Sequence, residues 1–134
     1  MPRVSLAFFT AAALCGLGGM IWGVLMGASQ DFAMMPAHAH LNLVGWVTLS
    51  LMGGFYALAG AAGRLPWINF AFSASGPAVM IPALAIMLGG DKSAETMVIA
   101  GSVLTVLGML CFVVSVLSRW SAPGAARMSI APAE

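Results

Sequence analysis

Charged side chains divide the chain into four long uncharged stretches. These stretches run from Val4 to Gln30, from Phe32 to Gly63, from Leu65 to Gly90 and from Thr96 to Ser118. A helix that crosses a bilayer needs roughly 20 apolar residues, so each stretch is long enough for one pass and too short for two. Because the bilayer core offers no water to backbone polar groups, each pass is expected to be an α-helix.

The pattern therefore predicts an all-α membrane protein, an up-down bundle of four transmembrane helices. The helices are expected at Ser5–Ala28, Ala37–Ala62, Trp67–Leu88 and Glu95–Leu117. The first apolar run exceeds the roughly 7–15 residues of a signal peptide, so we interpret it as a retained helix. Residues 1–120 are expected to form one transmembrane domain. Residues 121–134, rich in Pro, Gly, Ala and Ser, are expected to be a disordered cytoplasmic tail.

Composition excludes a soluble domain and a nucleic-acid partner. Hydrophobic residues make up 61% of the 134 residues and charged residues only 7%, against about 25% charged residues in soluble domains. Lipid is therefore the expected surrounding. The net charge of +1 leaves no basic patch of the kind that phosphate backbones require.

The distribution of Lys and Arg predicts the orientation. With four passes, the arginines Arg3, Arg64, Arg119 and Arg127 fall on one side, and Lys92 falls on the other with Asp31, Asp91 and Glu95. The positive-inside rule then places both termini in the cytoplasm of a bacterial inner membrane, with the loops around Asp31 and Asp91 in the periplasm. Trp67 and Trp120 are expected at the cytoplasmic interface, where amphipathic rings collect.

Small residues and prolines mark candidate helix contacts and kinks. Gly19, Gly23 and Gly27 share one face of the first helix, and Gly53, Ala57 and Ala61 share one face of the second. Such faces mediate close helix packing in lipid, either within one chain or between subunits. Pro77 and Pro82 predict kinks in the third helix. Cys15 and Cys111, at similar cytoplasmic depth, are interpreted as small buried side chains without a disulfide.

The candidate chemistry centres on the only two histidines, His38 and His40, near the periplasmic end of the second helix. Imidazole is well suited to ligate iron, copper or zinc at neutral pH. Positions i and i+2 lie about 200° apart around a helix, so the two side chains are expected on opposite faces, with two separate sites. Gly45, deeper on the His38 face, would leave room for a flat group. The alternative is that both histidines are solvated at the membrane surface.

The run His38-Ala39-His40-Leu41-x-x-x-Gly45 resembles a late helix of the large subunit of nitric oxide reductases, within the haem-copper oxidase superfamily. The resemblance covers about one helix of the four predicted here. It implies haem b as the cofactor, with His38 matching the ligand of the active-site haem and His40 that of the low-spin haem. His40-Leu41-Asn42-Leu43 is also similar to a motif in the second helix of that family.

Two histidines cannot build the two haems and the copper site of such an enzyme, so catalytic residues stay unknown and enzymatic activity stays open. A haem with two axial histidines would need a second chain, which predicts a homo-oligomer sharing haem ligands. Met34 or Met35 could instead supply a thioether ligand. Asn42, Gly45 and Trp46 are expected beside the cofactor. Asn42, Trp46 and Tyr56 are candidates to orient its ligands.

The expected role is respiratory electron transfer or binding of a diatomic gas (O2 or NO), with respiratory-chain proteins as possible partners. A second hypothesis is copper handling, because Met34, Met35, His38 and His40 form a cluster of ligands that suit Cu(I). Methionine is abundant here, with 11 residues, and often only fills packing gaps. A third hypothesis is an accessory subunit without a cofactor.

Overall fold

The computed structural model describes residues 1–120 and shows a bundle of four long helical segments. The first is α1 (Arg3–Ser29). The second is continuous from Met35 to Ala59 and comprises α2 (Met35–His40), the π-helix η1 (Leu41–Thr48) and α3 (Leu49–Ala59). The third is α4 (Leu65–Leu88). The fourth begins with the 3-10 turn η2 (Lys92–Ala94) and continues as α5 (Glu95–Trp120).

This architecture confirms the predicted all-helical, up-down bundle. All four segments are long and apolar enough to cross a membrane. The helix bounds lie within three residues of the expected ones, and the end of α4 at Leu88 and the start of α5 at Glu95 are as expected. The tail expected at 121–134 lies outside the described residues, as does the side chain of Trp120.

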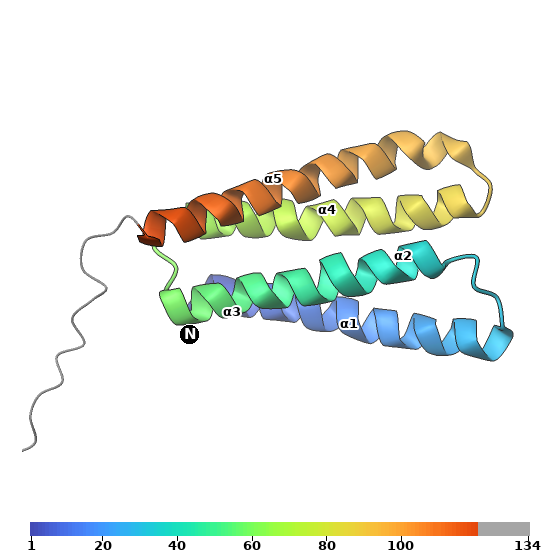
Figure 1. Cartoon of the computed structure of the whole chain (residues 1–134), viewed down its shortest axis with the longest axis horizontal. Helices are drawn as coiled ribbons and strands as arrows, with labels where there is room; N and C mark the ends of the chain where they lie inside the picture. Colours follow the sequence, from blue (N-terminus) through green and yellow to red (C-terminus); the bar gives the residue numbers. More distant parts are fainter. Residues whose placement is uncertain (121–134) are drawn as a thin grey trace, which may run out of the picture.

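The bundle consists of two helical hairpins, one made of α1 and the second segment, the other of α4 and α5 (Figure 1). The N-terminus and the α3–α4 connection lie at one end, which carries Arg3, Arg64 and Arg119 and is here termed the arginine end. The α1–α2 and α4–α5 connections lie at the other, termed the acidic end, which carries Asp31, Asp91, Lys92 and Glu95.

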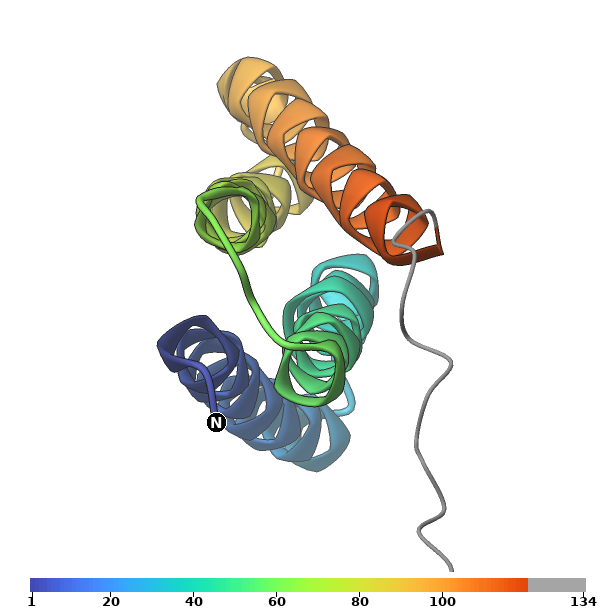
Figure 2. The same cartoon turned by 90° about the vertical axis from the view of Figure 1, so that its left-hand side faces the viewer.

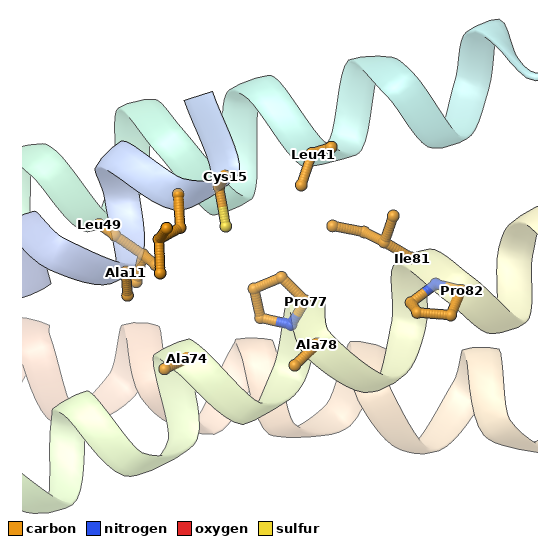
Figure 3. A pocket seen from close by; sticks show the side chains of 10 residues that line it. Ala11, Cys15, Leu41, Leu49, Ala74, Pro77, Ala78, Ile81 and Pro82 are labelled. Carbon is orange, nitrogen blue, oxygen red and sulfur yellow. The ribbon is translucent and has the colours of Figure 1, made fainter. Parts of the chain in front are cut away.

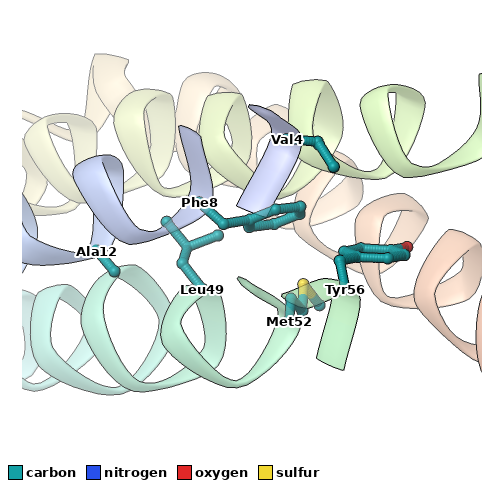
Figure 4. Close-up of a cluster of buried hydrophobic side chains, with 6 residues drawn as sticks. All are labelled: Val4, Phe8, Ala12, Leu49, Met52 and Tyr56. Atoms are coloured by element: carbon teal, nitrogen blue, oxygen red, sulfur yellow. The ribbon is translucent and has the colours of Figure 1, made fainter. Parts of the chain in front are cut away.

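A core of large side chains holds α1 against α3 in the arginine half of the bundle (Figure 4). Its buried members are Val4, Phe8, Ala12, Leu49, Met52 and Tyr56. Phe8 also meets Phe70 of α4 edge to face at 5.1 Å between ring centroids, and Phe55 meets Phe112 of α5 at 5.2 Å. These aromatic contacts join the two hairpins at this end.

Glycines allow α4 and α5 to approach each other closely. A Cβ on Gly101 would lie 2.5 Å from the backbone nitrogen of Met80, and a Cβ on Gly76 or Gly108 would collide with Thr105 or Ser73. In lipid, such close packing is the main source of helix association. Pro77 and Pro82 both lie inside α4, and each removes one backbone hydrogen-bond donor from the helix.

Towards the acidic end, α5 diverges from the second segment. Figure 2 looks along the bundle from the arginine end and shows α5 passing close to α3 there and then crossing away over α4. At the arginine end, the guanidinium of Arg119 donates a hydrogen bond to the carbonyl oxygen of Gly60, at 2.8 Å. One side of α2 is consequently not covered by α5.

Candidate functional site

Both histidines lie in the six-residue helix α2, directly before the chain changes from α- to π-helical winding. The π-helical stretch Leu41–Thr48 is eight residues long, and the hydroxyl of Thr48 donates to the carbonyl oxygen of Leu43, five residues earlier, at 2.8 Å. π-helical turns are rare and occur often at functional sites. This one lies between the histidines and the packed core at α3.

His38 is partly buried between α2 and α1. Its ring lies over Gly23, where an added Cβ would be 3.1 Å from Cε1 of the imidazole. The side-chain amide of Asn42 donates to the backbone carbonyl of His38 at 2.9 Å and lies 3.4 Å from both ring nitrogens. Asn42 in turn packs on Gly19. Gly19 and Gly23 thus accommodate two polar side chains of the same chain.

His40 differs from His38 in being exposed, on another side of the helix. Its Nδ1 lies 2.7 Å from the carbonyl oxygen of Pro36, one turn earlier. Since a carbonyl oxygen can only accept, this hydrogen bond requires the proton to be on Nδ1. The lone pair of a neutral ring is then on Nε2. Metal-ligating histidines usually have this arrangement, with one nitrogen anchored and the other free.

In this structure, Cys15 of α1 lies beside Gly45, on the side where room for a flat group was expected. A Cβ on Gly45 would lie 2.9 Å from Sγ of Cys15, so Gly45 permits the close approach of α1. The indole of Trp46 similarly lies against Gly16 of α1, 3.0 Å from where its Cβ would be. Asn42, Gly45 and Trp46 thus all contact α1 in this structure, and their expected place beside a cofactor stays a prediction.

Tyr56 does not lie near the histidines. Sixteen residues separate it from His40, which is more than about 20 Å along a helix. Its hydroxyl accepts from the amide of Asn69 at 2.9 Å and donates to the hydroxyl of Ser115 at 2.8 Å. Ser73 donates to Asn69 at 2.8 Å. This buried polar chain connects α3, α4 and α5, and Asn69, an amide inside an apolar run, was the only signal of it in the sequence.

The small-residue faces are used within the chain. Besides the contacts of Gly19 and Gly23 with the second segment, Gly53 packs on Phe8 and Ser5 of α1. Gly27 has open space around it. Both cysteines are free thiols.

An apolar cleft of about 330 Å³ opens between the two hairpins (Figure 3). It is lined by Ala11, Leu14, Cys15, Leu41, Leu49, Ala74, Pro77, Ala78, Ile81 and Pro82. Neither histidine is among these residues. The cleft offers shape and apolar surface but no polar group to orient a ligand.

Within residues 1–120, no group of three or more His, Cys, Asp or Glu side chains could hold a metal ion. Met34 occupies the N-cap position of α2, and Met35 is the first residue of that helix. The histidines thus form no closed metal site with other residues of the described part, 1–120.

Comparisons with protein-family models, with curated proteins and with solved structures gave no match. The class of the protein therefore follows from its own fold and composition. It is a multi-pass helical membrane protein with four candidate spans.

Proposed function

We propose that this chain is a haem b-binding integral membrane protein that serves respiratory electron transfer or binds a diatomic gas. The observation that carries the proposal is His40. Its imidazole is exposed, its Nδ1 is anchored by the carbonyl of Pro36, and its Nε2 is left free to ligate iron. The resemblance of the motif around it to nitric oxide reductase large subunits supports haem as the group that it binds.

His40 is the better ligand of the two histidines. Its side of the second segment is accessible, whereas His38 lies against Gly23, so His38 could reach an iron only if α1 moved away. The positive-inside rule supports a periplasmic position for both, because they lie near the acidic end and the arginines lie at the other. The site would then exchange electrons with partners on the periplasmic side.

A test of this proposal compares the wild type with the double variant His38→Ala, His40→Ala. Both are purified in detergent from a haem-replete host, and haem is measured by the Soret absorbance per chain. The double variant should lose the Soret band while circular dichroism still reports a helical protein. Full haem content in the double variant would disprove the assignment of the site.

Copper handling is the second candidate, favoured by the position of Met34 and Met35 at the start of the helix that carries both histidines. Thioether and imidazole together suit Cu(I). The variant Met34→Leu, Met35→Leu distinguishes the two functions, because it removes soft ligands and keeps both imidazoles. It should retain haem if the haem proposal holds and should lose Cu(I) affinity if copper is the ligand.

A further inference from the structure

We infer that a second copy of this chain completes the haem site, so that one haem lies between two copies and His40 of each supplies one axial ligand. This inference rests on the proposed function. It names the second ligand, the stoichiometry and the surface that forms the interface.

The first argument is the environment of His40. The side chains that follow it on the exposed side of the segment are apolar: Leu43 is 62% exposed and Val47 is 40% exposed. A porphyrin presents a flat, largely apolar face, which can pack against such side chains in lipid through van der Waals contact. His40 itself is exposed. The surface therefore fits one face of a haem.

The second argument is the lack of a second imidazole for the opposite face of that haem within one copy. The only other imidazole, His38, lies against α1 at Gly23, and positions i and i+2 lie about 200° apart on a helix. Both histidines of one chain therefore cannot hold the same iron from opposite sides.

A second copy supplies the missing ligand, because it carries its own His40. Two-fold symmetric dimers bring the same surface of each subunit together, so a residue near the axis meets its own equivalent. His40 placed near such an axis would face His40 of the other copy across the haem. In both copies, the bond from Nδ1 to the carbonyl of Pro36 would fix the ring and present Nε2 to the iron.

The experiment titrates haemin into the detergent-purified full-length chain from a haem-deficient host. It follows the optical spectrum and, by light scattering, the number of chains per particle. The expected endpoint is one haem per two chains, with a six-coordinate low-spin spectrum and with dimers that depend on haem. An endpoint of one haem per chain with a five-coordinate high-spin spectrum would overturn the inference and leave the proposed function standing. No haem binding by the wild type would overturn both.

Matched variants test which histidine is shared. His40→Ala should weaken haem binding more than tenfold and abolish the haem-dependent dimer, whereas His38→Ala should keep the one-to-two endpoint. The reverse result would overturn the assignment of His40. Because a variant can fail by misfolding, His40→Gly is titrated with and without free imidazole. Restoration of the low-spin spectrum by imidazole shows that the ring acts as a ligand, and a folded variant without restoration contradicts it.

Discussion

At the scale of single residues, Gly19 and Gly23 explain how polar side chains are placed inside an apolar bundle. Asn42 and His38 lie directly over these two glycines, where a larger residue would displace them. A polar side chain at membrane depth needs a hydrogen-bond partner, and the amide of Asn42 has one in the carbonyl oxygen of His38. The two glycines therefore determine how α1 meets the histidine-bearing segment.

We predict that Gly19→Ala destabilises the protein by about 1–3 kcal/mol, the usual cost of overpacking. The new Cβ would lie 2.5 to 2.8 Å from the side-chain amide of Asn42. Gly27→Ala is the matched control, because nothing lies within 4 Å of that position. It should be neutral or stabilising by up to about 1 kcal/mol, since alanine is the better helix former. Thermal unfolding in detergent measures both, and equal midpoints would contradict this packing.

Tyr56→Phe should cost about 1–3 kcal/mol, because the buried amide of Asn69 loses its acceptor while the ring remains. Ser75→Ala is the control. Its hydroxyl bonds only to the carbonyl of Phe72 in the same helix and is partly buried, so its loss should change stability little. Comparison of unfolding midpoints in the same detergent tests the pair. A Phe variant as stable as the wild type would show that the polar chain contributes nothing to the fold.

At the scale of elements, the order and length of the four helical segments could be predicted because long uncharged runs allow little else in lipid. The π-helical winding at Leu41–Thr48 could not be predicted, since its residues also suit an α-helix. The separation of His38 from His40 followed from helical spacing. Helical spacing could not predict the contact between Gly45 and Cys15, because these two residues lie in different helical segments.

The turn into α5 depends on Asp91, whose carboxylate accepts from the backbone N–H of Ser93 at 2.9 Å. Hydrogen bonds from Ser93 lower the pKa of Asp91. A lowered pKa in the folded state means that this contribution to stability is present above the ordinary pKa and is lost as the pH falls through the folded value.

We predict that Asp91→Ala lowers the unfolding midpoint at pH 7 but not at a pH below the pKa of Asp91, where the wild type has lost the charge. Asp91→Asn keeps an oxygen acceptor and removes the charge. At pH 7 its unfolding midpoint should therefore lie between those of the wild type and Asp91→Ala, and it should depend less on pH than that of the wild type. Thermal unfolding of the three proteins across the acidic range provides the measurement. A deficit of Asp91→Ala that does not change with pH would contradict the role of the charge.

At the scale of the whole molecule, the two ends of the bundle differ in charge. Three arginines lie at the arginine end, and all acidic residues of the described part lie at the other. The positive-inside rule therefore predicts a cytoplasmic arginine end. This orientation decides on which side of the membrane the histidines lie.

Single cysteines test the orientation in a background of Cys15→Ala and Cys111→Ala. The two substitutions are Gln30→Cys, in the α1–α2 connection, and Ala62→Cys, in the α3–α4 connection. Both positions are exposed. In intact cells, a membrane-impermeant maleimide should label Gln30→Cys fully, and Ala62→Cys only after permeabilisation. The opposite pattern would place the histidines on the cytoplasmic side.

The most direct test of haem binding is the optical spectrum of the wild-type protein, oxidised and then reduced with dithionite, after purification in detergent from a haem-replete host. We predict a Soret band with sharp α and β bands on reduction, as a low-spin haem b with two axial ligands requires. A folded protein without a Soret band would contradict haem binding. Copper handling or an accessory role would then be the function to test.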